Sequence, residues 1–378
     1  MEGQSLPETR GALEMGTVAE PDGTRYRGFC YPGSLVRLPT GKLMASFTAQ
    51  CPPHPFRAMA CRSTDNGRTW TSPEVLFGGE GLSAASKDTG EGYADPCLVV
   101  AGRGRVIALC VSLLYEAGRG GYSLARTRFW RRISLDGGET FGPVEEMPRH
   151  HRYIVGTIHP GLRLRDGTLL LPYSWDRSAE QNRPAEGEGG MDLVSGVLTS
   201  RDGGATWTAG GDLHPEVPRA SNALPSAVSG LDEPAVVELP DGDLFLLART
   251  GSNRLWQSFS HDGGRTWERA QPSPLVSHNC PAALLRLAQD DAILVVYNNH
   301  PEQRACLSVS LSADGCRSWT EPKVIAPIGH PDRPEASYPA VCQLDDGTLL
   351  TIFGQIDHSD PGSLFSVRSV RFDRSFLA

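Results

Sequence analysis

Polar and apolar residues alternate over short segments along most of this chain, and turn residues separate the segments. Residues 255–260 (LWQSFS) alternate in this way and then enter an Asp-Gly-Gly turn. Successive side chains of a strand point to opposite faces, so a period of two predicts half-buried β-strands. Helical periodicity is weak throughout. The pattern therefore predicts an all-β fold built from many short strands.

Two-residue turns that contain glycine recur between apolar segments. Such a turn is the strongest short-range signal for a β-hairpin. We expect six hairpins, four with a clear turn and two with a weaker pattern. Their turns lie at 40–41, 166–167, 241–242 and 346–347, and the weaker hairpins span 102–109 and 286–296.

An eight-residue motif, SxDxGxTW, alternates with the hairpins. Aspartate bonds back to nearby backbone amides and glycine adopts positive φ, so the motif predicts a tight turn whose aromatic residue folds back as a local plug. We interpret its aspartates as structural, because a catalytic site needs unlike groups that converge once. The copies span 63–70, 134–141 (ending in Phe), 200–207, 260–267 and 312–319 (with Cys316 and Ser318 replacing Gly and Thr).

The spacing of the octads predicts the architecture. Their first residues are 71, 66, 60 and 52 positions apart, which fits four-stranded propeller blades with loops of varying length. We expect a single six-bladed β-propeller over residues 14–378, preceded by a tail at 1–13. The sixth unit, near 341–353, has no octad. A strand from the N-terminal segment around 24–29 is expected to complete it, which would close the ring and remove an exposed edge.

Composition narrows the class of partner. The chain has 378 residues, 42 glycines and 29 prolines, and its net charge of −8 argues against nucleic acid or an anionic membrane. Nine scattered cysteines without CxxC pairs favour reduced thiols. No secretory signal pattern opens the sequence, and no apolar run approaches the roughly 20 residues that span a bilayer. These features predict a cytoplasmic location.

Motifs for cofactors are missing from the sequence. It has no metal-ligand motif, no phosphate-binding glycine loop and no nucleophile elbow. We therefore expect no metal and no cofactor. The expected partner is a small-molecule or oligosaccharide substrate, and the sequence leaves the oligomeric state open.

The octads that alternate with Asp-Gly hairpins resemble the Asp boxes (BNR repeats) of the sialidase (neuraminidase) superfamily, over nearly the whole chain. The resemblance implies a six-bladed propeller with five Asp-box turns at its rim and catalysis at the ring centre. In that family three arginines hold the substrate carboxylate. A tyrosine with a glutamate partner acts as nucleophile, and an aspartate as acid/base.

Four residues match the family pattern. The segment DEPAVVELPDG resembles the one that carries the glutamate partner, which implies that role for Glu233. Arg249 matches the second triad arginine, and Arg304, eight residues before the last octad, matches the third. Tyr338 precedes the last hairpin at the position of the nucleophile. Arginine pairs a carboxylate in a planar fork, and a neutral tyrosine avoids the repulsion that a carboxylate nucleophile would meet.

The first hairpin departs from the pattern. In the family an Arg-Ile-Pro motif at the start of this hairpin supplies the first arginine of the triad. Here residues 30–32 are CYP, so Cys30 replaces that arginine. The family's catalytic aspartate follows in the next loop, yet residues 48–55 contain no carboxylate. His54 stands at that position. Histidine acts as general acid or base near neutral pH. A surface loop residue without a catalytic role is an equally simple explanation for a histidine at this position.

Other polar residues are candidates for the ring centre. Asp88, Glu91 and Asp95 precede the inner strand of the second blade, where one of them could replace the missing acid. His159 precedes the inner strand of the third blade. We expect Asp95 and His159 to bind substrate, although loop polarity or packing would equally account for each of these residues.

Three functions are compatible with these residues. The first is an exo-acting glycoside hydrolase that releases sialic acid or a related nonulosonic acid, with Tyr338 attacking, Glu233 assisting and His54 as acid/base. The second is a glycosidase or polysaccharide lyase acting on a uronic acid or another sugar, with Tyr338 and His54 as base and acid. The third is a non-catalytic carbohydrate-binding propeller. The sugar, the linkage and the effect of losing the first arginine stay open.

Overall fold

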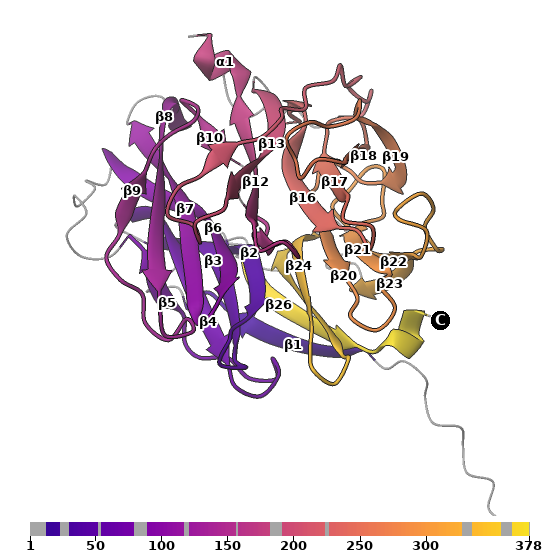
Figure 1. Ribbon diagram of the computed structural model, residues 1–378, viewed down its shortest axis with the longest axis horizontal. Coiled ribbons are helices and arrows are strands. Elements are labelled where there is room, and N and C mark those ends of the chain that lie inside the picture. The colour runs from indigo at the N-terminus through magenta and orange to yellow at the C-terminus, as the bar shows by residue number, and fades with distance from the viewer. Residues whose placement is uncertain are drawn as a thin grey trace, which may run out of the picture.

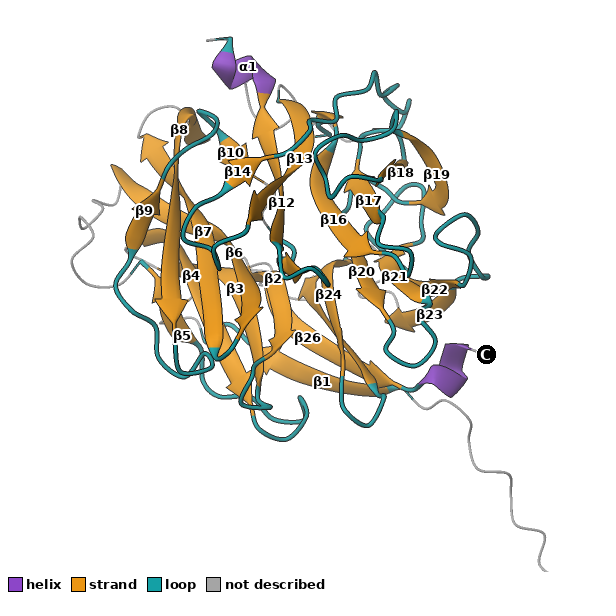
Figure 2. Ribbon diagram, viewed as in Figure 1, coloured by secondary structure: helices purple, strands orange, loops and turns teal. Residues whose placement is uncertain are grey.

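Six small sheets form a ring in the computed structural model (Figure 1), which confirms the predicted six-bladed β-propeller. The described helices are α1 (Arg177–Glu180) and a 3-10 turn, η2 (Arg374–Leu377), and neither is long and apolar enough to cross a membrane (Figure 2). The structure describes residues 13–22, 30–51, 54–78, 89–116, 121–155, 158–181, 191–223, 227–326, 335–356 and 365–377.

The strands follow one another within each blade in chain order, except in blades 3 and 6. Blade 1 contains β2 (Cys30–Arg37), β3 (Leu43–Cys51), β4 (His54–Ser63) and β5 (Glu74–Phe77). Blade 2 contains β6 (Thr89–Gly102), β7 (Arg105–Glu116), β8 (Gly121–Ser134) and β9 (Glu145–Met147). Blade 4 contains β16 (Asp232–Glu238), β17 (Leu244–Arg249), β18 (Arg254–Ser260) and β19 (Gln271–Val276). Blade 5 contains β20 (Ala283–Arg286), β21 (Ile293–Asn298), β22 (Leu307–Ser312) and β23 (Lys323–Ala326).

Blade 3 has an interrupted inner edge. Two short strands, β10 and β11, both pair with β12, and His159 lies in the interval between them. A further short strand, β15, pairs in parallel with β13. The strands are β10 (Ile154–Val155), β11 (Leu162–Arg163), β12 (Leu169–Asp176), β13 (Asp192–Ser200), β14 (Thr208–Ala209) and β15 (Ser229–Gly230).

Blade 6 joins the two ends of the chain. It contains β24 (Ala336–Gln343), β25 (Leu349–Ile356), β26 (Phe365–Phe372) and, as its outer strand, β1 (Glu14–Ala19). The expectation that an N-terminal strand closes the ring is confirmed, but its position was wrong. The strand begins at Glu14, where Val18 and Ala19 are buried between blades 6 and 1. Residues 24–29, the expected strand, lie outside the described residues.

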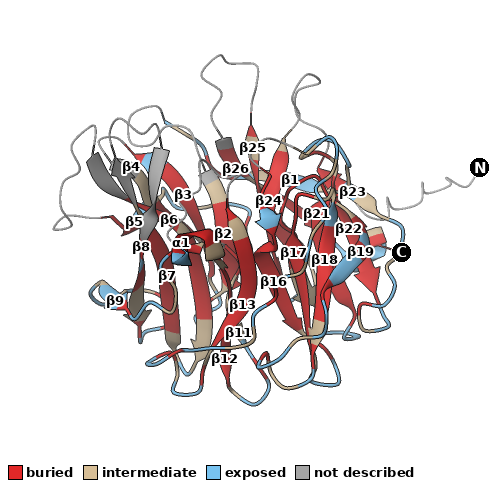
Figure 3. Ribbon diagram, turned by 90° about the horizontal axis from the view of Figure 1, so that it is seen from above, coloured by how far each residue is buried: buried red, intermediate tan, exposed pale blue. Residues whose placement is uncertain are grey.

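The hydrophobic core is divided among the interfaces between blades. Each of the six interfaces has its own buried cluster, so every blade is covered on both faces. Between blades 2 and 3, for example, Ile107 and Leu109 pack with Leu169 and Leu171. Figure 3 shows the consequence, since the strands are buried along most of their length and exposed residues gather in turns. The first strands of the blades surround the centre, with β2 contacting β6 and β24.

The five octads form one hydrogen-bonded turn each. The serine hydroxyl accepts a hydrogen bond of 2.8–2.9 Å from the amide of the residue four positions on, as Ser260 does from Gly264. It also donates to the aspartate, whose other oxygen accepts the Thr or Ser hydroxyl at 2.5–2.7 Å. These bonds favour the ionised carboxylate, and the Thr69 hydroxyl above all lowers the pKa of Asp65 to about 2.

Each octad also joins its blade to the preceding one. Trp207 of blade 3 lies in the cluster between blades 2 and 3, and Trp267 of blade 4 packs against the next cluster. At Gly204 (φ 86°) an added Cβ would lie 2.1 Å from Ile107 of blade 2, so only glycine fits there. The local plug expected from the sequence is therefore a contact between neighbouring blades.

Candidate active site

The predicted site residues gather at the end of the blades that lies opposite the Asp boxes. In blade 4, Asp232 pairs with Arg249 at one end of the β16–β17 hairpin. Leu244 pairs with Ser260, the first residue of the octad, at the other end. We call the group formed by Asp232, Glu233, Arg249, Asn279, Arg304 and Tyr338 the axial cluster.

Three alternate blades present a residue in the same unusual backbone conformation. Asp95 in blade 2, Glu233 in blade 4 and Tyr338 in blade 6 have φ of 51°, 47° and 56°. Each precedes a proline and lies where the pairing of the inner strand shifts register. A left-handed non-glycine residue costs on the order of 1–3 kcal/mol, and such strain persists at functional sites. The shared register shift and positive φ therefore single out Asp95, Glu233 and Tyr338 as equivalent positions of three blades.

Arg249 connects the two residues proposed for the chemistry. Its Nη1 donates to Glu233 Oε2 at 2.8 Å and to Tyr338 Oη at 3.2 Å, and its Nε donates to Asn279 Oδ1 at 3.0 Å. Burial alone would lower the pKa of this guanidinium, but Glu233 and Tyr338 outweigh it and raise the pKa well above its ordinary value. Arg249 therefore stays charged although it is almost fully buried.

Tyr338 is enclosed on its ring faces. The Tyr31 ring lies against it with centroids 4.3 Å apart, and the Arg304 guanidinium carbon lies 5.5 Å from the ring centroid. Burial and Glu233 raise the pKa of the phenol well above its ordinary value, against the opposing effect of the arginines. Tyr338 is accordingly a neutral phenol.

Arg304 and its neighbours leave polar atoms without partners. Arg304 Nη2 donates to the Asn279 carbonyl at 3.0 Å, and Nη1 lies 3.5 Å from Glu335 Oε1. Its Nε, Asn279 Nδ2 and His159 Nε2 are buried with no hydrogen-bond partner in the described part of the chain. Buried polar groups are normally paired, so these atoms point to a polar ligand or water.

His159 lies beside the glutamate. It hydrogen-bonds the Glu233 backbone, and burial lowers its pKa to about 4 although Glu233 opposes the shift. The imidazole is therefore neutral at physiological pH. The Asp95 amide donates to Thr48 Oγ1 at 3.0 Å, and the Asp95 carboxylate interacts electrostatically with Asp232.

Two candidate residues of blade 1, Cys30 and His54, each begin a strand. His54 was expected in a loop, but it is the first residue of β4 and pairs with Cys51. The side chains of His54, Cys30 and Glu91 lie outside the description, as does residue 88 altogether. No group of three or more His, Cys, Asp or Glu side chains among the described residues is arranged to hold a metal ion.

Sequence reasoning missed Asp232, Asn279 and Tyr31. A usable signal was present, because an X-Pro pair occurs once in the inner segment of every blade. The residues before proline are Tyr31, Asp95, His159, Glu233, Cys280 and Tyr338. Tyr31 is itself one of these residues. Asp232 and Asn279 each lie one position before one of them, next to Glu233 and Cys280.

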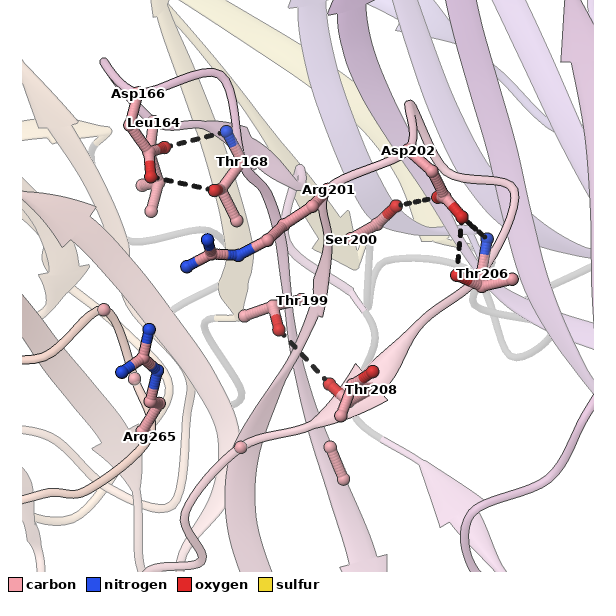
Figure 4. A pocket seen from close by; sticks show the side chains of 14 residues that line it. Leu164, Asp166, Thr168, Thr199, Ser200, Arg201, Asp202, Thr206, Thr208 and Arg265 are labelled. Atoms are coloured by element: carbon pink, nitrogen blue, oxygen red, sulfur yellow. Dashed lines mark hydrogen bonds between the residues drawn. The ribbon is translucent and has the colours of Figure 1, made fainter.

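A hollow of about 450 Å³ lies between blades 3 and 4, on the Asp-box side. Figure 4 shows Arg201 and Arg265 extending into it beside the hydroxyls of Thr199 and Thr208. None of its lining residues belongs to the axial cluster.

Comparison with known proteins agrees with this description. Residues 62–351 match the BNR repeat-like domain family. A sialidase of Micromonospora viridifaciens is 26% identical over 91% of this chain and 51% of its own length. The chain spans about half the length of the curated relatives it matches.

Solved sialidase structures share the fold. A variant of the NanB sialidase from Streptococcus pneumoniae superposes with a TM-score of 0.73 at 14% identity, covering 96% of this chain and 71% of that one. The intramolecular trans-sialidase from Ruminococcus gnavus, in complex with oseltamivir carboxylate, gives 0.69 at 17% identity and covers 96% and 97%. With the octads and the ring of blades, these matches show that the chain belongs to the BNR-repeat propellers of the sialidase superfamily.

Proposed function

We propose that this protein is a sialidase-like exo-glycoside hydrolase that releases a terminal acidic sugar, sialic acid or a related nonulosonic acid. One observation carries the proposal. A single nitrogen of Arg249 lies 2.8 Å from Glu233 Oε2 and 3.2 Å from Tyr338 Oη, which brings the proposed base, nucleophile and cation together.

The arginines would hold the acidic group of the sugar. Arg304 Nε is buried without a partner among the described residues, and Arg249 keeps its charge through burial. A carboxylate placed between the two guanidiniums would orient the anomeric carbon toward Tyr338. Asp95 and His159 would contact the rest of the sugar from blades 2 and 3.

The reaction would proceed in two displacements. Glu233 takes the phenol proton of Tyr338 as Oη bonds to the anomeric carbon, and the glycosidic C–O bond breaks. The leaving oxygen takes a proton from a general acid. In the second step that group, now a base, takes a proton from water, and the water oxygen bonds to the anomeric carbon as the bond from that carbon to Tyr338 Oη breaks. Tyr338 Oη then recovers its proton from Glu233. Two inversions retain configuration.

The general acid would come from the side of blades 1 and 2. His54 is the first candidate, from its position after the first hairpin. Asp95 is the second, supported by its left-handed backbone and its charge interaction with the cluster.

A second function is favoured by blade 1. Cys30 replaces the first arginine of the family, and Tyr31 covers the blade-1 side of Tyr338. Such a site suits a uronic acid or another non-sialic sugar, cleaved by hydrolysis or by elimination with Tyr338 as base.

The test is a screen of terminal sialosides, related nonulosonic acids and uronides with wild type, Tyr338→Phe and Ser260→Ala. Hydrolysis of a sialoside or nonulosonide by wild type and Ser260→Ala, but not by Tyr338→Phe, supports the proposal. A product that absorbs in the ultraviolet indicates elimination instead. Binding without turnover, unchanged in Tyr338→Phe, would contradict both enzymatic functions.

A further inference from the structure

Asp232 is a second buried carboxyl group at the base of the axial cluster. It is 3% exposed, beside Glu233 at 7%. Its Oδ1 accepts the Glu233 amide at 2.8 Å, and Ser174 Oγ accepts the same amide at the longer distance of 3.1 Å. Its Oδ2 lies 3.8 Å from the Arg249 nitrogen that bonds Glu233. Two carboxyl groups thus face one guanidinium.

The charges that act on Asp232 do not balance two ionised carboxylates, because Arg304, the second cation of the axial cluster, lies against Tyr338 and Glu335 instead. Glu233 and Arg249 face Asp232 from its own blade, and Asp95 adds a further negative charge from β6. His159, from blade 3, is neutral because burial lowers its pKa to about 4. An unpaired buried charge is costly, and neighbouring carboxyl groups relieve the cost by retaining a proton.

We propose that Asp232 is a positioning residue that stays protonated at neutral pH and, as the neutral acid, holds Glu233 in its left-handed conformation. The inference rests on the proposed function only in treating Glu233 as the base of the reaction. Burial first, and then the charge of Glu233, raise the pKa of Asp232 well above its ordinary value. Arg249 consequently remains available to Glu233, Tyr338 and an acidic ligand.

Ionisation of Asp232 would change the site. A second negative charge would compete for Arg249 and repel an acidic sugar. Affinity for sialic acid should therefore fall as the pH rises through the pKa of Asp232 in the folded protein. Asparagine keeps the shape of the neutral acid and accepts the same backbone hydrogen bond, so Asp232→Asn should remove this pH dependence.

The first measurement needs no activity. A raised folded pKa stabilises the protein below the unfolded pKa of about 3.9, and this stabilisation is lost as pH rises toward the folded pKa. We would measure thermal unfolding of wild type, Asp232→Asn and the rim control Asp262→Asn from pH 5 to 9. The Tm of Asp232→Asn relative to wild type should rise by at least about 2 °C over this range, while Asp262→Asn stays parallel to wild type.

The second measurement is calorimetric binding of sialic acid across the same pH range. The affinity of wild type should fall at the alkaline end by about tenfold, and that of Asp232→Asn should stay within about twofold. A Tm difference that does not change with pH, or an Asp232→Asn variant that is unfolded at pH 5, would overturn the inference. Failure of wild type to bind any acidic sugar counts against the proposed function alone, because the unfolding series still tests Asp232.

Discussion

Aspartate side chains serve two regions of this propeller in opposite ways. At the rim, Asp65 and Asp262 are solvated, and each is bonded to hydroxyls and amides of its own turn. At the axis, Asp232 is buried and shares Arg249 with Glu233. The rim supplies hydrogen bonds that favour the charged form, whereas burial at the axis disfavours it. The same residue type therefore acts as a structural anion at the rim and as a group of shifted pKa at the axis.

The comparison is tested most strongly at Glu233. Glu233→Gln removes the proposed base but keeps the shape, so turnover should fall by about 10²–10⁴-fold, the usual contribution of a positioned base. Asp262→Asn at the rim should leave turnover unchanged. Steady-state kinetics on the best substrate of the screen measures both, and equal losses in the two variants would contradict the division between rim and axis.

Arg249 tests whether the axial cluster also carries stability. Arg249→Ala leaves the charged Glu233 buried without its cation, which should destabilise the fold by about 3–5 kcal/mol. Arg249→Lys keeps the charge without the planar fork and should lose less stability. Urea denaturation compares the two, and an alanine variant as stable as wild type would show that the carboxyl groups find other partners.

His159 adds a pH dependence to the axis. Its folded pKa of about 4 lies below the unfolded value, so the stabilisation is present above pH 6.5 and is lost as pH falls toward 4. The expected loss is about 3 kcal/mol. Urea denaturation at pH 7, 5.5 and 4.5 would measure this loss of unfolding free energy. In His159→Gln the unfolding free energy should fall less steeply with decreasing pH. If the unfolding free energy of His159→Gln changes with pH as steeply as that of wild type, the pH dependence arises from other groups.

Ser260 tests the rim. Ser260→Ala removes the hydroxyl that accepts the Gly264 amide at 2.9 Å and donates to Asp262 at 3.0 Å. Loss of these bonds in a buried position should cost about 1–2 kcal/mol of unfolding free energy without affecting the KM or kcat. A loss of activity at constant stability would mean that the rim influences the site directly.

The smallest effect is expected in the hollow between blades 3 and 4. Arg201 is exposed there and lies on the Asp-box side. Arg201→Ala should change the unfolding free energy by no more than about 0.5 kcal/mol and leave turnover as in wild type. A change in KM for an acidic substrate would place substrate contacts on this side as well.

The blades were predictable because their signals are local. The hairpin turns and the octads each lie within a few residues, and their spacing determines the blade count. The position of β1 was not predictable in this way, because its partner β26 lies at the other end of the chain. Likewise, the packing of Trp207 between blades depends on a tertiary neighbour, Ile107, that no local pattern identifies.

At the site, family resemblance identified Glu233, Arg249, Arg304 and Tyr338, which the structure brings together. Asp232 was overlooked although it adjoins Glu233 in sequence. Its role depends on facing Arg249 across the β16–β17 pair, and on burial that only the assembled ring provides.

The pairing of β1 with β26 also bears on how the chain folds during synthesis. Glu14 lies opposite Arg371, so the last blade is incomplete until β26 has left the ribosome. At typical elongation rates of about 5–20 residues per second, β1 waits on the order of tens of seconds for its partner. During that interval β1 has no partner strand, and its open edge is exposed to other nascent chains. Ring closure is thus the step at which this protein is most exposed to misassembly.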